Sequence, residues 1–71
     1  MDTVYWIKFY EDGKFVTVVG QPHQTMVEAV VAAGLFAVSI SNAGFSIVQD
    51  GPGQFHYDRY STVCTVKIEE E

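Results

Sequence analysis

Two runs of β-branched and aromatic residues stand near the start of the chain, and a turn signal separates them. Residues 4–10 and 15–19 form the runs, and Asp12-Gly13 lies between them. Asp-Gly favours a two-residue type I′ turn because both central residues need positive φ, and the twist of that turn matches the strands. The pattern therefore predicts a β-hairpin that pairs Tyr10 with Phe15, Phe9 with Val16, Lys8 with Thr17 and Ile7 with Val18.

The predicted register divides the hairpin side chains between two faces, because successive residues of a strand point to opposite sides. One face carries Tyr5, Ile7, Phe9, Val16 and Val18. The other face carries Val4, Trp6, Tyr10, Phe15 and Val19. Lys8 and Thr17 lie at the centre of the second face, which is therefore expected to be the wetter one. It is unusually aromatic for a surface in contact with solvent.

A capping-box sequence at Thr25 to Glu28 follows the hairpin and predicts the start of a helix. We expect the helix to run to Ala33, with Gly34 as its C-terminal stop, and a longer helix to Ala37 is the alternative. Apolar residues cover nearly the whole circumference of this segment, so little of it is expected to face water. The sequence therefore predicts a core helix.

The second half of the chain contains two further predicted strands. Residues 45–49 alternate between apolar and polar, and residues 60–68 are long and β-branched. The second of these strands carries on one face Thr62, Cys64, Val66 and Ile68. Residues 37–41 fit either a helix or a strand. The remaining segments are a loop at 50–53, a loop or extended arm at 54–59, and a frayed acidic tail at 69–71.

Composition supports a folded domain. The chain has 71 residues, of which 48% are hydrophobic and 18% are charged, the reverse of the composition of disordered proteins. Together with the order of elements, this predicts an α+β fold in a single domain, residues 1–71. We expect a small antiparallel sheet of three to five strands packed on one α-helix, in the order ββα followed by two or three strands. A domain this small has marginal stability, which favours a further interface, such as that of a homodimer.

The cysteine count indicates the redox environment of the chain, and the net charge disfavours some classes of partner. Cys64 is the only cysteine, so no intrachain disulfide forms, and a reducing, cytoplasmic location is expected. The sequence contains no run of about 18 apolar residues and no basic flank at Met1 to Thr3, so neither membrane insertion nor export is expected. The formal net charge of −5 disfavours direct binding to nucleic acid or anionic lipid.

Few residues have the spacing that catalysis or metal binding needs. His56 and Asp58 would share one side of an extended segment, as an acid–base or metal pair requires, and Cys64 is a conceivable nucleophile. A zinc site needs three or four ligands, and Cys64 lies in a β-branched strand, where it is expected to be a core residue. The Gly51-Pro52-Gly53 loop precedes no helix and so is not a phosphate loop. We therefore expect no catalytic residue, no metal and no cofactor; a small hydrolase using His56, Asp58 and Cys64 is the unfavoured alternative.

The acidic residues suggest a second class of function. Spaced carboxylates can imitate a phosphate backbone and block a nucleic-acid-binding enzyme. Three of the nine acids form the C-terminal run, and the rest are scattered at Asp2, Glu11, Asp12, Glu28, Asp50 and Asp58. Asp50 and Asp58 are the candidate partner-binding acids of this group. A solvated surface explains the same distribution, so both interpretations stay open.

Trp6, Tyr10 and Phe15 are the most informative residues of the sequence. Aromatic side chains on the wetter face of a hairpin are typical of protein interfaces, because they bury a large area and have few rotamers to lose. The alternative is that the late segment, with Phe55, Tyr57 and Tyr60, covers them. We predict that Trp6, Tyr10 and Phe15 bind a partner protein, or a second copy of the chain.

The order strand, Asp-Gly turn, strand and then Thr25-x-x-Glu28-Ala29 resembles the N-terminal module of HicB-type antitoxins. The resemblance covers residues 4–33. It departs from the family in a shorter stretch before the helix, a more apolar helix and the lack of a DNA-binding extension after Ile68. It implies a module that neutralises a partner by contact. In size, acidity and strand–helix build the chain is also similar to small phage-encoded inhibitors, including anti-CRISPR proteins.

These observations favour a non-enzymatic protein-binding module of bacterial or phage type. It would inhibit or neutralise its partner by covering the partner's surface. The acidic nucleic-acid mimic is the first alternative, and the small enzyme is the second.

Overall fold

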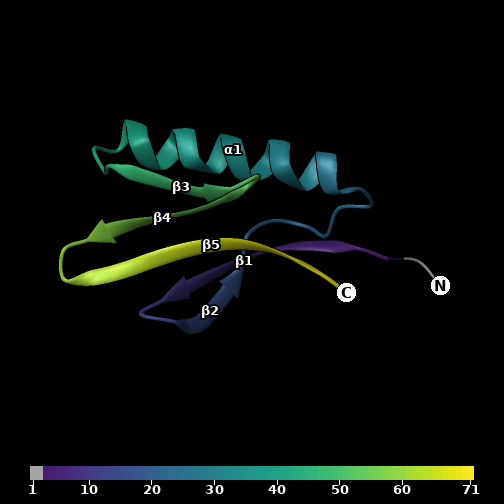
Figure 1. Cartoon of the computed structure of the whole chain (residues 1–71), viewed down its shortest axis with the longest axis horizontal. Coiled ribbons are helices and arrows are strands. Elements are labelled where there is room, and N and C mark those ends of the chain that lie inside the picture. The colour runs from purple at the N-terminus through teal and green to yellow at the C-terminus, as the bar shows by residue number, and fades with distance from the viewer. Residues whose placement is uncertain (1–2) are drawn as a thin grey trace.

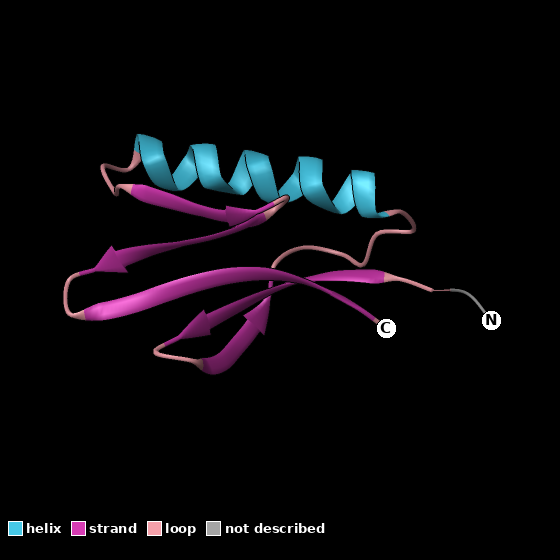
Figure 2. Ribbon diagram, in the orientation of Figure 1, coloured by secondary structure: helices cyan, strands magenta, loops and turns pink. Residues whose placement is uncertain are grey.

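The computed structural model describes residues 3–71. Its elements are β1 (Tyr5–Glu11), β2 (Lys14–Val18), α1 (Met26–Asn42), β3 (Ile47–Gly51), β4 (Gln54–Arg59) and β5 (Thr62–Glu70) (Figure 1). The strands form one antiparallel sheet in the order β2-β1-β5-β4-β3. α1 lies along one side of this sheet (Figure 2). The predicted α+β fold, with a small antiparallel sheet packed on one helix, is confirmed.

The hairpin turn forms as predicted, but the register changes beyond it. Asp12 and Gly13 have φ of 49° and 81°, and Tyr10 pairs with Phe15. Phe9 then pairs with Thr17 instead of Val16, because a β-bulge adds one residue to β2. A shift of one residue moves side chains to the opposite face.

Because of the bulge, the faces predicted for the second hairpin strand are wrong after Phe15. Val16 and Val18, expected on the helix side, are 46% and 37% exposed. Val19, expected on the opposite side, packs against the core, and its amide donates to the carbonyl of Ile7 at 2.8 Å. The faces predicted for β1 are confirmed, because Ile7 is buried and Tyr5 and Phe9 pack against the core.

The helix starts where predicted and ends later. Thr25 is its N-cap, and the Thr25 Oγ1 atom accepts a hydrogen bond of 3.2 Å from the amide of Glu28. The prediction that Gly34 stops the helix is wrong: α1 continues for two further turns. The cost of an interior glycine is offset because the later turns bring Phe36 and Ile40 to the core, with the Phe36 ring 6.2 Å from that of Phe55. Residues 37–41 are therefore helical.

A Schellman motif ends α1 at residues 42–44. Gly44 has a φ of 103°, and its amide donates to the carbonyl of Ser41 at 3.0 Å. The amide of Phe45 reaches the carbonyl of Ile40 at 3.4 Å. These two bonds satisfy carbonyls that the helix leaves unpaired. Gly44 supplies the positive φ that this motif needs, a conformation that glycine adopts readily.

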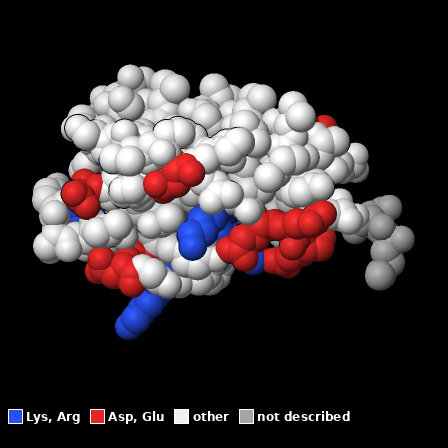
Figure 3. Space-filling view, viewed as in Figure 1, with Lys and Arg blue, Asp and Glu red and all other residues white. Residues whose placement is uncertain are grey.

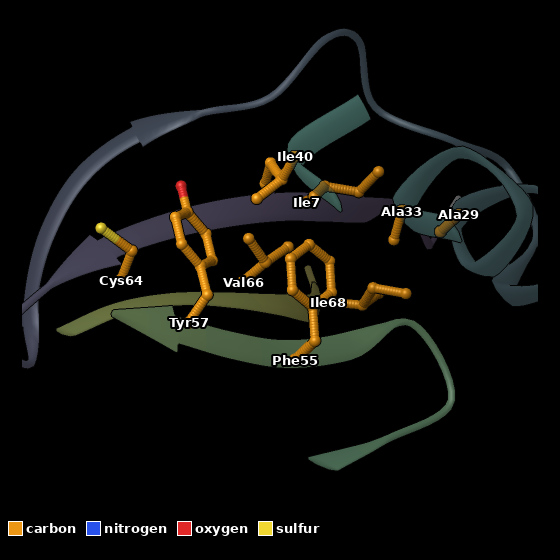
Figure 4. Packing of buried hydrophobic residues seen from close by; sticks show 9 residues of the cluster. All are labelled: Ile7, Ala29, Ala33, Ile40, Phe55, Tyr57, Cys64, Val66 and Ile68. Atoms are coloured by element: carbon orange, nitrogen blue, oxygen red, sulfur yellow. The ribbon is translucent and has the colours of Figure 1, made fainter. Parts of the chain in front are cut away.

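Small residues on α1 let the helix lie close to the sheet. Ala29 and Ala33 are fully buried and face the inner side chains of the strands (Figure 4). The buried cluster consists of Ile7, Ala29, Ala33, Ile40, Phe55, Tyr57, Cys64, Val66 and Ile68. The predicted inner face of β5 is thus confirmed at Cys64, Val66 and Ile68.

The C-terminal strands are shifted along the chain and are better paired than predicted. The strand expected at 45–49 begins at Ile47, and residues 54–59 form β4, a full strand. The prediction of a frayed acidic tail is wrong. β5 lies at the centre of the sheet, so Glu69 and Glu70 pair with β1, and the amide of Glu71 donates to the carbonyl of Val4 at 2.8 Å.

The outer side of α1 faces solvent, contrary to the prediction of a core helix. The sheet covers one side of the helix, and residues 3–71 supply no second layer for the other (Figure 2). Val27 and Leu35 are 72% and 68% exposed as a result.

The described part of the chain contains no helix with the length and apolar character needed to span a bilayer.

Candidate functional site

The candidate site is the side of the sheet that faces away from α1. We call it the outer sheet face. Its side chains alternate along β1, β2 and β5 with those that enter the core. The outer sheet face consists of Trp6, Lys8, Tyr10, Phe15, Val18, Thr65, Lys67 and Glu69. The three aromatic residues predicted to share the wetter face of the hairpin therefore do lie on one side of the sheet.

Two of the aromatic rings form a cluster with two lysines. The rings of Tyr10 and Phe15 are 5.8 Å apart and meet edge to face, at 73°. Lys8 Nζ lies 5.9 Å from the centre of the Phe15 ring, and Lys67 Nζ lies 5.2 Å from the centre of the Tyr10 ring. Cations at these distances are attracted by the ring quadrupole. The cluster thus presents apolar area with positive charge at its borders.

The C-terminal acids pair with the outer sheet face. The Tyr10 hydroxyl donates to Glu69, and this hydrogen bond lowers the pKa of the Glu69 carboxyl and raises the pKa of Tyr10. The Lys8 ammonium donates to Glu71 and lies 3.5 Å from Glu69 Oε1; the bond to Glu71 raises the pKa of Lys8. The predicted acidic tail is therefore partly neutralised by side chains of β1.

The predicted alternative, in which the late segment covers the aromatic residues, is wrong. Phe55 and Tyr57 point into the core beneath α1 (Figure 4), and Tyr60 lies in the turn after β4 with 90% of its surface exposed. Phe15 is 55% exposed, while Trp6 and Tyr10 are half-buried. The outer sheet face is thus open to a partner.

The element order that carries the resemblance to HicB-type modules is present as β1, β2 and α1. No family model, curated protein or solved structure matches this chain. The resemblance, and the partner class that it implies, stay predictions. The outer sheet face is the surface that these three elements leave exposed on the side away from the helix.

The two predicted partner-binding acids lie apart from the aromatic cluster. Asp50 is an exposed residue of β3, and its carboxylate lies 2.8 Å from His56 Nδ1 on the neighbouring strand β4. Asp58 is exposed near the end of β4. The structure therefore pairs His56 with Asp50 and not with Asp58. Asp2, a third scattered acid, lies outside the described residues.

The fold separates the residues of the unfavoured enzyme hypothesis. His56 pairs with Thr65, on the outer side of the sheet, whereas Cys64 is fully buried on the inner side beside Tyr57. Burial and the neighbouring Cys64 raise the pKa of Tyr57 to about 12. No group of three or more His, Cys, Asp and Glu that could hold a metal ion occurs within residues 3–71.

A shallow hollow at the C-terminal end of α1 was not predicted. It has a volume of about 250 Å³ and is lined by Ser39, Ile40, Ala43, Phe45, Tyr57, Arg59 and Tyr60. These residues come from the end of the helix, the loop after it, β4 and the β4–β5 turn. No local pattern joins them, so only the tertiary structure reveals the hollow.

Proposed function

We propose that this chain is a non-enzymatic protein-binding module that inhibits or neutralises a partner protein by covering its surface with the outer sheet face. The observation that carries the proposal is Phe15, whose ring packs edge-on against Tyr10 while remaining 55% exposed. Tryptophan and tyrosine dominate the energetics of many interfaces because they bury a large area at a low entropic cost. Trp6, Tyr10 and Phe15 are the proposed anchors.

The charged neighbours of the anchors support the proposal because they order the rings before a partner arrives. Lys8 lies over Phe15, Lys67 lies over Tyr10, and Glu69 accepts from the Tyr10 hydroxyl. Side chains ordered in advance lose less conformational entropy on association. The matching partner surface has an apolar depression for the rings and a border with charges of both signs.

The resemblance of residues 4–33 to HicB-type modules supports a toxin as the partner. A bacterial defence protein, neutralised by a phage-encoded inhibitor, fits the size and acidity of the chain by analogy. In both cases the module acts by contact and performs no chemistry of its own.

Charge distribution weighs against the acidic decoy, the second class of function. A phosphate mimic needs an array of one sign, whereas Lys8 and Lys67 are interleaved with Glu69 and Glu71 on the outer sheet face. The decoy also predicts an affinity that falls steeply with salt, because exposed charges are screened. An interface anchored by aromatic rings depends much less on salt.

The test compares the affinities of the wild-type chain and its variants for one purified partner. Immobilised wild-type chain captures its partner from a lysate of the native host, mass spectrometry identifies that protein, and calorimetry then measures its affinity in purified form. We expect the double variant Trp6→Ser/Phe15→Ser to bind at least about tenfold more weakly. Tyr60→Ser is the matched control, because Tyr60 is an exposed aromatic residue in the β4–β5 turn and is not a member of the outer sheet face.

Two outcomes would remove the proposal. The first is an equal affinity of wild type, double variant and control, with circular dichroism showing that all three fold. The second is an affinity that collapses when Asp50 and Asp58 are changed to Asn and when salt is raised, with the aromatic variants unaffected. That second result would favour the acidic decoy.

A further inference from the structure

An apolar stripe runs along the outward side of α1, on the opposite side of the molecule from the outer sheet face. Its members are spaced by four, four and three residues, which places them on one face of the helix. They are Val27, Val31, Leu35 and Val38, with exposed fractions of 72%, 59%, 68% and 56%. We call this surface the helix stripe. Large apolar residues that lie together on a surface mark a contact site.

The helix stripe is the uncharged side of an acidic molecule. α1 contains no Lys or Arg, and Glu28 is its one acidic residue. Figure 3 shows charged side chains gathered over the strands and their turns, with almost none over the helix. Two copies that each carry a charge of −5 repel one another. Contact through their helices keeps the charged surfaces as far apart as the fold allows.

A lipid surface fits the helix stripe less well. Helices that lie in a membrane interface carry Lys and Arg on their polar side, which attract anionic headgroups. α1 offers neither residue, and the net charge of −5 adds repulsion. A protein surface without charge is therefore the better match, and the chain itself supplies one.

The residue spacing of the helix stripe would let two copies pack against each other. Gly34 interrupts the stripe, and a Cβ atom built there meets no heavy atom within 4 Å, so a gap lies at this point. When two α1 helices pack antiparallel about a two-fold axis between residues 32 and 33, Val31 of one copy lies over Gly34 of the other. The same register places Val27 over Val38, and the two-fold axis repeats both contacts. Glycine is a poor helix residue, and a close approach at this point accounts for its presence.

From this shape and charge we propose that the chain forms a homodimer through the helix stripe, with α1 of one copy packed antiparallel on α1 of the second. A helix of 17 residues is about 25 Å long, so the contact is smaller than the roughly 800 Å² per partner of a standard interface. We therefore expect a weak association. The outer sheet faces of the two copies point away from each other, so the dimer presents two partner-binding surfaces.

Sedimentation equilibrium of the full chain, from about 5 μM to about 0.5 mM, tests the proposal. Wild type is expected to pass from monomer to dimer within this range. Val31→Glu is expected to weaken association at least about tenfold, because it buries a like charge at the axis. Val48→Glu is the charge-matched control: Val48 lies on β3, is 53% exposed and is remote from the helix stripe. It should dimerise as wild type does.

A third variant tests the antiparallel register itself. Gly34→Leu raises the helix propensity of α1, so it keeps the fold. The larger apolar surface alone would strengthen association, but the Leu side chain fills the gap that accepts Val31. We expect it to weaken association. A wild type that stays monomeric at the highest concentration would overturn the proposal, with or without binding to neutral phosphatidylcholine vesicles. Dimers of Val31→Glu or Gly34→Leu as tight as wild type would also overturn it.

Discussion

Gly53, in the turn between β3 and β4, lies directly against Val30 of α1. A Cβ atom built on Gly53 would be 3.2 Å from Val30 Cα and 3.3 Å from Val30 Cγ2, and it would also collide with Ile68 Cδ1. Gly53 is buried and has a φ of 69°, a conformation that side chains disfavour. The absence of a side chain at this position thus lets the turn pass beneath the helix.

Gly53→Ala is therefore expected to destabilise the fold by about 2 kcal/mol or more, from backbone strain together with the clash against α1. Urea unfolding followed by circular dichroism measures this change. Gly51→Ala is the control, because Gly51 is the last residue of β3 directly before the same turn, lacks a positive φ and has open space around its Cβ position. Equal free energies of unfolding for the two variants would show that the contact with Val30 has no energetic weight.

Local signals in the sequence were sufficient for the parts of the fold that depend on neighbouring residues. The Asp12-Gly13 turn and the Thr25 cap each involve residues at most three positions apart, and both form. The inner faces of β1 and β5 follow from the two-residue period of a strand. The bulge at Val16 has no local signal, so the faces of the β2 residues after Phe15 were predicted incorrectly.

Errors elsewhere arose where tertiary contacts outweigh local preference. Glycine has a low helix propensity and often ends a helix, so Gly34 was predicted to stop α1. The helix continues because Phe36 and Ile40 pack on the sheet. The acids at 69–71 have low strand propensity, but β5 is the central strand and pairs along its length with β1.

The aromatic members of the candidate site were predicted, because they follow from the hairpin alone. Lys67 and Glu69, which order these rings, were not. Their places depend on the pairing of β1 with β5, strands about sixty residues apart, and no pattern within either strand sets that register.

Tyr57 gives the stability of the domain a dependence on alkaline pH. The phenol is 6% exposed, and burial with Cys64 nearby raises its pKa to about 12, against 10.0 for the free side chain. Below pH 10 the phenol is neutral in both states, and its contribution to stability is complete. Between pH 10 and about 12 the unfolded chain loses the proton first, so unfolding becomes easier as the pH rises.

The expected loss is at most about 1.4 kcal/mol per pH unit in this window. Urea unfolding at pH 9, 10 and 11 measures it in wild type and in Tyr57→Phe, which cannot ionise at this position. We expect the free energy of unfolding to fall more steeply in wild type. Parallel pH profiles for the two proteins would contradict the assignment to Tyr57.

Tyr60 stores backbone strain in the turn between β4 and β5. It has a φ of 57°, a left-handed conformation that costs a residue with a bulky side chain roughly 1 to 2 kcal/mol. Its side chain is 90% exposed, so few contacts compensate for this cost. Asparagine tolerates the left-handed region much better.

Tyr60→Asn is therefore expected to stabilise the domain by about 0.5 to 1 kcal/mol, which corresponds to a rise in Tm of roughly 2 to 8 °C for a chain of this size. Thermal unfolding at low protein concentration measures the change and keeps dimer formation from contributing. Ser61→Asn is the matched control, because Ser61 lies beside Tyr60 in the turn but does not have a positive φ. A lower Tm for Tyr60→Asn, or the same gain for Ser61→Asn, would show that strain at residue 60 is not what limits the stability of this turn.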